Sequence, residues 1–136
     1  MSDIASSRLH HVGIVCPNRE HAETLLGVMG LAVHSEQYVA AYEADCIFTS
    51  GPGGRVELIV PRGGRLTKFN KGAGGLHHVA IEVSSLAAET ERLRSDGVEL
   101  LEEVPVDAGD LLINFVPPAF TRGVTVELVQ VRPRKE

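Results

Sequence analysis

The sequence predicts an α+β fold made of two βαβββ modules. The tetrapeptide LHHV occurs at residues 9–12 and again at residues 76–79. Each copy is followed by one helix-like segment and then by three strand-like segments. The second histidines of the two copies are 67 residues apart, and the glutamates of the two VEL strands are 70 apart. These similar offsets indicate a duplicated module, and two copies can close by pairing across a pseudo-twofold axis.

A helix is predicted after each histidine strand. In the first module Asn18 caps a helix that ends at Gly30, and in the second module Ser84 or Ser85 provides the cap and Gly97 the end. The residues that recur along one face are Ala22, Leu25, Leu26 and Met29 in the first helix, and Leu86, Thr90 and Leu93 in the second.

Three strands are predicted after each helix, because β-branched and aromatic residues concentrate there. They are AVHSEQYV, ADCIFTS and RVELIV in the first module, and VELLEEV, LLINFV and VTVELVQV in the second. GPGG at residues 51–54 is predicted to be a turn, and VPPAFTRG takes the corresponding place in the second module.

We therefore expect a single domain over residues 1–136. Module one spans 8–60, a linker spans 61–75, and module two spans 76–131. The glycine- and lysine-rich linker is expected to contain a short helix or an ordered loop near residues 66–69.

Length, composition and charge exclude several classes of protein. The 136 residues are 43% hydrophobic and 23% charged, which is typical of a soluble globular chain, and no apolar run is long enough to span a membrane. The start lacks an apolar segment typical of a secretory signal, and the two cysteines are too few for a disulfide framework, so a cytoplasmic location is expected. A net charge of -5 argues against nucleic acid as a partner.

The alternation of side chains along strands selects one histidine of each pair. His10 shares the apolar face of its strand with Val12 and Ile14, whereas His11 faces the other side. The same reasoning puts His78, rather than His77, on the corresponding open face. The last strand of each module places Glu57 and Glu127 on that face as well.

Two imidazoles and two carboxylates on equivalent strands predict a site for one divalent metal. Carboxylates between apolar neighbours are costly unless they coordinate or pair. This donor set suits zinc, manganese, cobalt, nickel or ferrous iron, and a six-coordinate ion would keep two positions open. The alternative is that the histidines are hydrogen-bonded strand residues and that the glutamates face solvent.

These motifs resemble the vicinal oxygen chelate superfamily, the glyoxalase-type fold, over nearly the whole chain. Within it, LHHVGIVCPN, RVELIVP, KGAGGLHHVAIEV and GVTVELVQ are most similar to the methylmalonyl-CoA epimerases. The resemblance implies a cup-shaped mixed sheet in which His11, Glu57, His78 and Glu127 hold one divalent ion, such as cobalt, zinc, manganese or nickel.

The resemblance also implies an epimerase that acts on a 2-substituted malonyl-CoA thioester. A divalent ion can hold a 1,3-dicarbonyl unit and stabilise the enolate formed when the carbon between the carbonyls loses a proton. Two acid/base groups must then flank that carbon. The resemblance gives one of these roles to Glu127. Glu43 is the candidate for the other, with a solvated strand-end residue as the alternative.

Several segments differ from the family pattern or leave a role open. VDAGD and VPPAF replace the glycine-and-histidine loop and the histidine-proline pair of these epimerases, and residues 117–120 make the expected mouth of the cavity more apolar. Asn114 is a ligand contact or a strand-edge hydrogen-bonding residue. Arg62, Arg65, Lys68 and Lys71 form a basic cluster whose lysines either meet the phosphates of CoA or belong to a solvated loop.

Other functions use the same fold. A glyoxalase I-type lyase would use the same four ligands on the hemithioacetal of a thiol, and a non-catalytic ligand-binding protein would not need them. An extradiol dioxygenase normally uses two histidines and one carboxylate, so Glu57 would obstruct it. We expect a small-molecule substrate, an acyl-CoA, and a homodimer.

Overall fold

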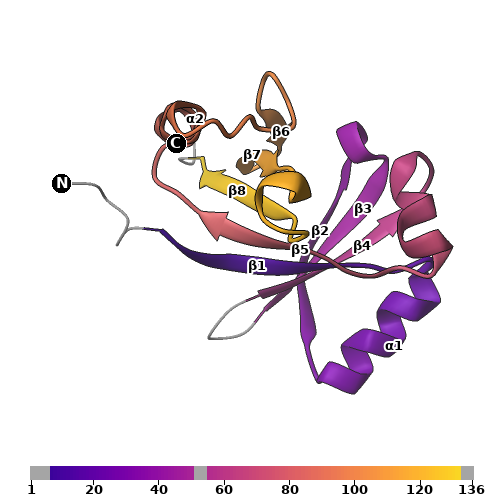
Figure 1. The fold of residues 1–136 in the computed structure, drawn as a ribbon. Helices are drawn as coiled ribbons and strands as arrows, with labels where there is room; N and C mark the ends of the chain where they lie inside the picture. The colour runs from indigo at the N-terminus through magenta and orange to yellow at the C-terminus, as the bar shows by residue number, and fades with distance from the viewer. Residues whose placement is uncertain (1–6, 51–54, 133–136) are drawn as a thin grey trace. The chain divides into compact units, whose positions relative to one another are not determined.

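The computed structural model describes residues 7–50 and 55–132, which form two compact units (Figure 1). One unit comprises residues 11–77, and the other comprises residues 78–136 together with residues 1–10. The turn predicted at GPGG lies outside the described residues. The elements are β1 (Arg8–Val15), α1 (Arg19–Met29), β2 (Ala32–Val39), η2 (Ala40–Tyr42), β3 (Ala44–Ser50), β4 (Arg55–Pro61), η3 (Arg65–Gly72), β5 (Gly75–Glu82), α2 (Leu86–Ser95), β6 (Val106–Ala108), β7 (Leu111–Val116), η4 (Pro118–Phe120) and β8 (Val126–Val131).

The strands of the two halves are paired in the same way. In the first half the order is β2-β3-β4-β1, with β1 and β4 parallel and the other neighbours antiparallel. In the second half the order is β5-β8-β7-β6, with β5 and β8 parallel and the other neighbours antiparallel. Each half therefore joins its first and last strands in parallel, and the predicted α+β class with paired βαβββ modules and mixed strand pairing is confirmed.

Both helices begin at the caps predicted for them. The Asn18 side chain accepts a hydrogen bond from the backbone N–H of His21, and the Ser85 side chain accepts one from Ala88. Gly30 ends α1 in the left-handed conformation, with φ of 68°, which a residue with a Cβ adopts only at a cost. Of the two serines proposed for α2, Ser85 is thus the cap. No helix among the described residues is long and apolar enough to cross a membrane.

Each helix covers one face of the strands in its own unit, as the alternation predicts. In the first unit Ala22, Leu25 and Leu26 of α1 pack with Leu58 and Ile14. In the second unit Leu86 and Leu93 of α2 pack with Leu128, Ile81 and other apolar residues of the strands. His11, Glu57, His78 and Glu127 belong to the opposite faces of these strands.

The opposite face of the first unit is covered further along by η3. Its Leu66 and Phe69 pack against Val15 and Ile59, so the linker contains the short helical segment that was predicted. After η3 the chain passes very close to the end of β1. A Cβ at Gly74 would lie 2.3 Å from the carbonyl oxygen of Val15, and only glycine fits this crossing.

One predicted strand is wrong. VELLEEV, at residues 98–104, forms no strand, and β6 is a three-residue strand that follows it. The reason is a side chain. The amide of Asn114 accepts a hydrogen bond from Glu102 N at 3.0 Å and donates one to Glu102 O at 2.9 Å, which replaces the backbone pairing of a ladder. The last strand is also shorter than predicted, because β8 begins at Val126.

Candidate metal centre

The first unit brings His11 and Glu57 together. His11 lies on β1 and Glu57 on β4, its parallel neighbour, where Glu57 is level with Gly13. The Nε2 atom of His11 is 3.1 Å from Oε1 of Glu57. Both residues are buried, with 1% of His11 and 7% of Glu57 exposed.

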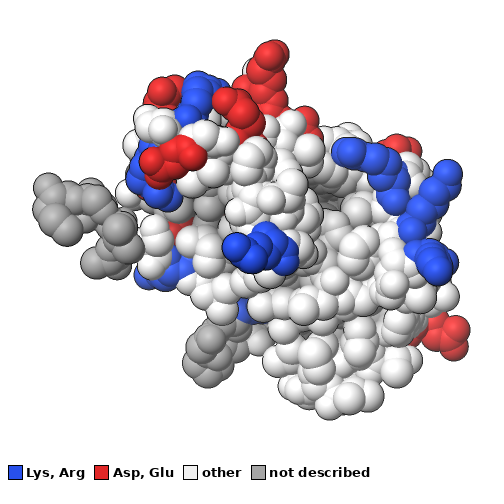
Figure 2. All heavy atoms as spheres, in the orientation of Figure 1, with Lys and Arg blue, Asp and Glu red and all other residues white. Residues whose placement is uncertain are grey.

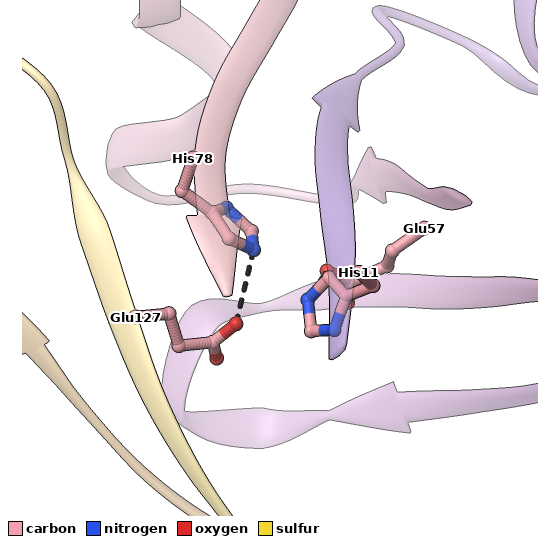
Figure 3. Close-up of side chains that lie close together, drawn as sticks. All are labelled: His11, Glu57, His78 and Glu127. Carbon is pink, nitrogen blue, oxygen red and sulfur yellow. Dashed lines mark ion pairs between the residues drawn. The ribbon is translucent and has the colours of Figure 1, made fainter. Parts of the chain in front are cut away.

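The second unit brings His78 and Glu127 together in the same way (Figure 3). His78 lies on β5 and Glu127 on β8, where Glu127 is level with Ala80. The Nε2 atom of His78 is 3.0 Å from Oε1 of Glu127, the contact drawn dashed in Figure 3. Each residue is 4% exposed. The two modules therefore repeat one local geometry, a histidine two residues before the position level with the glutamate.

Small residues make each histidine–glutamate contact possible. Gly13 and Ala80 share a face with His11 and His78, respectively, and each lies directly beside the glutamate of its unit. A larger side chain at either position would fill the space through which the carboxylate reaches the imidazole. The two LHHVxI segments carry this small residue after the valine, a signal that the motif analysis did not use.

A phenylalanine contacts each histidine edge-on, and sequence reasoning missed both. Phe48 lies 5.1 Å from His11 between ring centroids, at an interplanar angle of 86°. Phe115 lies 5.7 Å from His78, at 87°. Each phenylalanine is the antiparallel partner of the glutamate in its unit, Glu57 or Glu127. Their separation of 67 residues equals that of the histidines, so the repeat itself could have revealed them.

The donor set of each pair fits a divalent metal ion. Each of the four side chains offers one ligand atom, and all four are buried. An imidazole is ordinarily neutral near pH 7, so a histidine–carboxylate pair leaves a negative charge in a buried place. A divalent cation compensates such a charge, and imidazole nitrogen with carboxylate oxygen suits the first-row divalent ions.

Glu43 takes a different position in the first unit. It follows η2 with a left-handed φ of 52°, and its backbone carbonyl accepts a hydrogen bond from Arg62 N. Its exposed carboxylate lies against the backbone of Gly64, where a Cβ would come within 2.5 Å of Oε2. In the β3–β4 register Glu43 directly precedes the pair Ala44–Pro61 and lies roughly 13 Å along β3 from Phe48, the partner of Glu57.

The remaining candidates divide between structural and exposed positions. Asn114 is 2% exposed and holds Glu102, so of its two predicted roles the strand-edge hydrogen bond is the one found. Arg62 is paired with Asp45, at 2.7 Å between Nη2 and Oδ1. Lys68 and Lys71 are exposed on η3, and Phe120 is exposed on η4.

Comparison with protein families places the chain among known folds. Residues 10–115 match the model of the glyoxalase/bleomycin resistance protein/dioxygenase superfamily, and the chain belongs to this superfamily, also called the vicinal oxygen chelate superfamily. The resemblance predicted from the sequence is thereby confirmed.

Individual relatives are more specific. The chain is 32% identical to ethylmalonyl-CoA/methylmalonyl-CoA epimerase of Cereibacter sphaeroides, over 91% of this chain and 98% of that protein. It is 33% identical to the mitochondrial methylmalonyl-CoA epimerase of Homo sapiens, over 90% of this chain and 73% of that protein. Among solved structures, methylmalonyl-CoA epimerase from Mycobacterium tuberculosis is similar with a TM-score of 0.84 and 30% identity, over 92% of this chain and 88% of that one. Epimerase relatives support an enzyme of the isomerase class.

Proposed function

We propose that the protein is a divalent-metal-dependent epimerase of a 2-substituted malonyl-CoA thioester, with methylmalonyl-CoA as the first substrate to test. The observation that carries the proposal is the repetition of one buried histidine–glutamate pair in both modules of a chain whose relatives are named methylmalonyl-CoA epimerases. A purely structural pair would not need to occur twice with the same register and the same phenylalanine neighbour.

His11, Glu57, His78 and Glu127 are the proposed ligands of one ion. The ion, when bound, supplies a Lewis acid that holds the two carbonyl oxygens of the substrate and stabilises the enolate. The protein supplies the geometry around it. Phe48 and Phe115 fix the imidazole planes from the side, and burial excludes water from the carboxylates.

Two carboxylates are proposed to move the proton. An epimerase removes a proton from one side of the carbon between the carbonyls and returns a proton on the other side, so one group on each side is required. Glu127 is assigned one of these roles, through its second carboxylate oxygen. Glu43 is assigned the other, which requires that the bound thioester extend along β3 toward Gly63 and Gly64.

A homodimer in the cytoplasm completes the proposal, and sedimentation or light scattering of the purified protein tests the dimer. No basic balance favours nucleic acid, since the net charge is -5.

The decisive experiment is hydrogen exchange at the carbon between the carbonyls. Protein purified without added metal is analysed for bound ions, loaded with cobalt, zinc, manganese or nickel in turn, and incubated with methylmalonyl-CoA in deuterated water. Mass spectrometry should show uptake of one deuterium per substrate, at a rate that depends on the ion and disappears with a chelator.

Two results would overturn the proposal. Turnover of the hemithioacetal of glutathione without exchange in methylmalonyl-CoA would favour a glyoxalase I-type lyase. Tight binding of a ligand by protein that neither retains metal nor exchanges any substrate would indicate a non-catalytic binding protein.

A further inference from the structure

The segment η3 has two chemically different sides. In a 3-10 helix the side chains at i and i+3 lie one above the other. Leu66 and Phe69 share one side and pack on Val15 and Ile59. Arg65 and Lys68, which have the same spacing, share another side and are exposed. Apolar packing therefore anchors η3 and turns its basic side chains outward.

A third cation, Lys71, extends the basic side of η3. It follows a kink at Phe69–Lys71, where Asn70 and Lys71 both have left-handed φ angles, of 53° and 58°. The amide of Asn70 holds this turn by donating a hydrogen bond to Gly74 O at 2.7 Å. Lysine rarely takes this conformation, and such uncommon backbone angles concentrate at functional sites.

The three cations differ from most others in the described part of the chain. Six arginines among residues 7–50 and 55–132 form ion pairs with carboxylates: Arg8, Arg19, Arg62, Arg92, Arg94 and Arg132. Arg65, Lys68 and Lys71 form none within these ranges. Figure 2 shows Lys and Arg side chains gathered where Figure 1 draws η3. In a chain of net charge -5, a concentrated group of uncompensated cations favours an anionic ligand.

The basic group lies beside the face that carries the first ligand pair. His11 and Val15 project from the same face of β1, as Glu57 and Ile59 do from β4, because side chains alternate along a strand. The residues under η3 are therefore two positions beyond Glu57 and four beyond His11 on one continuous face. A ligand whose reactive end lies at that pair can reach η3 with an extended arm.

We propose that Arg65, Lys68 and Lys71 bind the phosphate groups at the nucleotide end of a CoA thioester. This inference rests on the proposed function, since it gives the second end of the same substrate a binding site. Lysine and arginine are the usual partners of phosphate, and each charge-assisted contact adds to affinity without touching the reacting carbon. The group therefore sets KM and leaves kcat unchanged.

The test compares two triple variants that both change the net charge from -5 to -8. In the first, Arg65, Lys68 and Lys71 become glutamine, and in the control Arg92, Arg94 and Arg122 become glutamine. Exchange is measured with methylmalonyl-CoA and with the same acyl group on pantetheine, which lacks the nucleotide. Affinity for free CoA and for dephospho-CoA is measured by calorimetry.

The η3 variant should raise KM for methylmalonyl-CoA roughly 10-fold or more at low ionic strength, with kcat and the pantetheine substrate unaffected. The control variant should show less than about a 2-fold change. Equal effects of the two variants, or an equal loss with the pantetheine thioester, would overturn the inference. Wild-type protein that binds free CoA through η3 but exchanges no substrate would sink the proposed function alone.

Discussion

The two modules agree where they carry the proposed ligands and differ at their outer strands. Phe48 in β3 and Phe115 in β7 occupy equivalent positions, and so do the histidine–glutamate pairs. One residue earlier the modules diverge, with buried Ile47 in the first and buried Asn114 in the second. Ile47 is paired with the eight-residue β2, whereas Asn114 uses its side chain to hold an irregular segment beside the three-residue β6. Duplicated geometry is thus retained around the ligands, and the outer edge is built by two different means.

The strongest way to break the apparent symmetry is to change its two glutamates. Glu127→Gln should lower the exchange rate on the order of 10³-fold, because the proposal gives Glu127 both a ligand atom and a proton to move. Glu57→Gln should lower it far less, because the amide oxygen remains as a ligand. Exchange rates are measured together with the metal content per chain. Equal losses at full metal content would show that no difference in role exists between the modules.

The divergent position should cost more in the second module. Asn114→Leu removes the partners of Glu102 N and O and of Phe115 N, which leaves buried polar groups without hydrogen bonds. We expect the free energy of unfolding to fall by about 2–3 kcal/mol. The matched change Ile47→Leu conserves volume and should cost less than about 1.5 kcal/mol. Urea unfolding measures both, and similar losses would mean that the amide is not what holds residues 98–104.

The conserved position should respond equally in both modules. Phe48→Leu and Phe115→Leu each remove an edge-on ring contact with a ligand histidine and leave a small void. Each should lower the free energy of unfolding by about 1–2 kcal/mol and weaken metal binding. Phe120→Leu, at an exposed ring, should stay within about 0.5 kcal/mol of wild type. A loss of metal affinity in only one of the two ring variants would contradict equivalent roles.

The smallest effect distinguishes the modules by pH. In the first module a hydrogen bond from Arg62 lowers the pKa of Asp45, and one from Arg19 lowers the pKa of Glu36. Since these folded pKa values lie below the unfolded ones, the stabilisation is present above the unfolded pKa and is lost as pH falls through the folded pKa. Carboxyl titration by NMR should show the pKa of Asp45 returning toward its ordinary value in Arg62→Gln. An unchanged titration would remove this ion pair from the account.

The sequence was sufficient for the periodic elements. β2, β3 and β7 have the predicted bounds, because alternating β-branched residues are bounded by clear turn residues. The choice of His11 and His78 over their neighbours also follows from alternation alone, and their contacts with Glu57 and Glu127 agree with it.

Other features depend on contacts that no local pattern contains. VELLEEV has the composition of a strand, but Asn114, ten residues beyond it, supplies the hydrogen bonds that a neighbouring strand would have supplied. The phenylalanine contacts depend on the antiparallel register of β3 with β4 and of β7 with β8. The pairing of Arg62 with Asp45, which separates it from the other basic residues of the linker, depends on β3 and β4 lying side by side.

The crossing at Gly74 limits how this chain can be altered. A methyl group there would collide with the carbonyl of Val15, so even alanine must displace either the end of β1 or the start of β5. Library mutagenesis should therefore tolerate many replacements at the outward positions of η3 and almost none at this glycine. For anyone engineering the loop toward other acyl carriers, the practical boundary of the redesignable segment is residue 73.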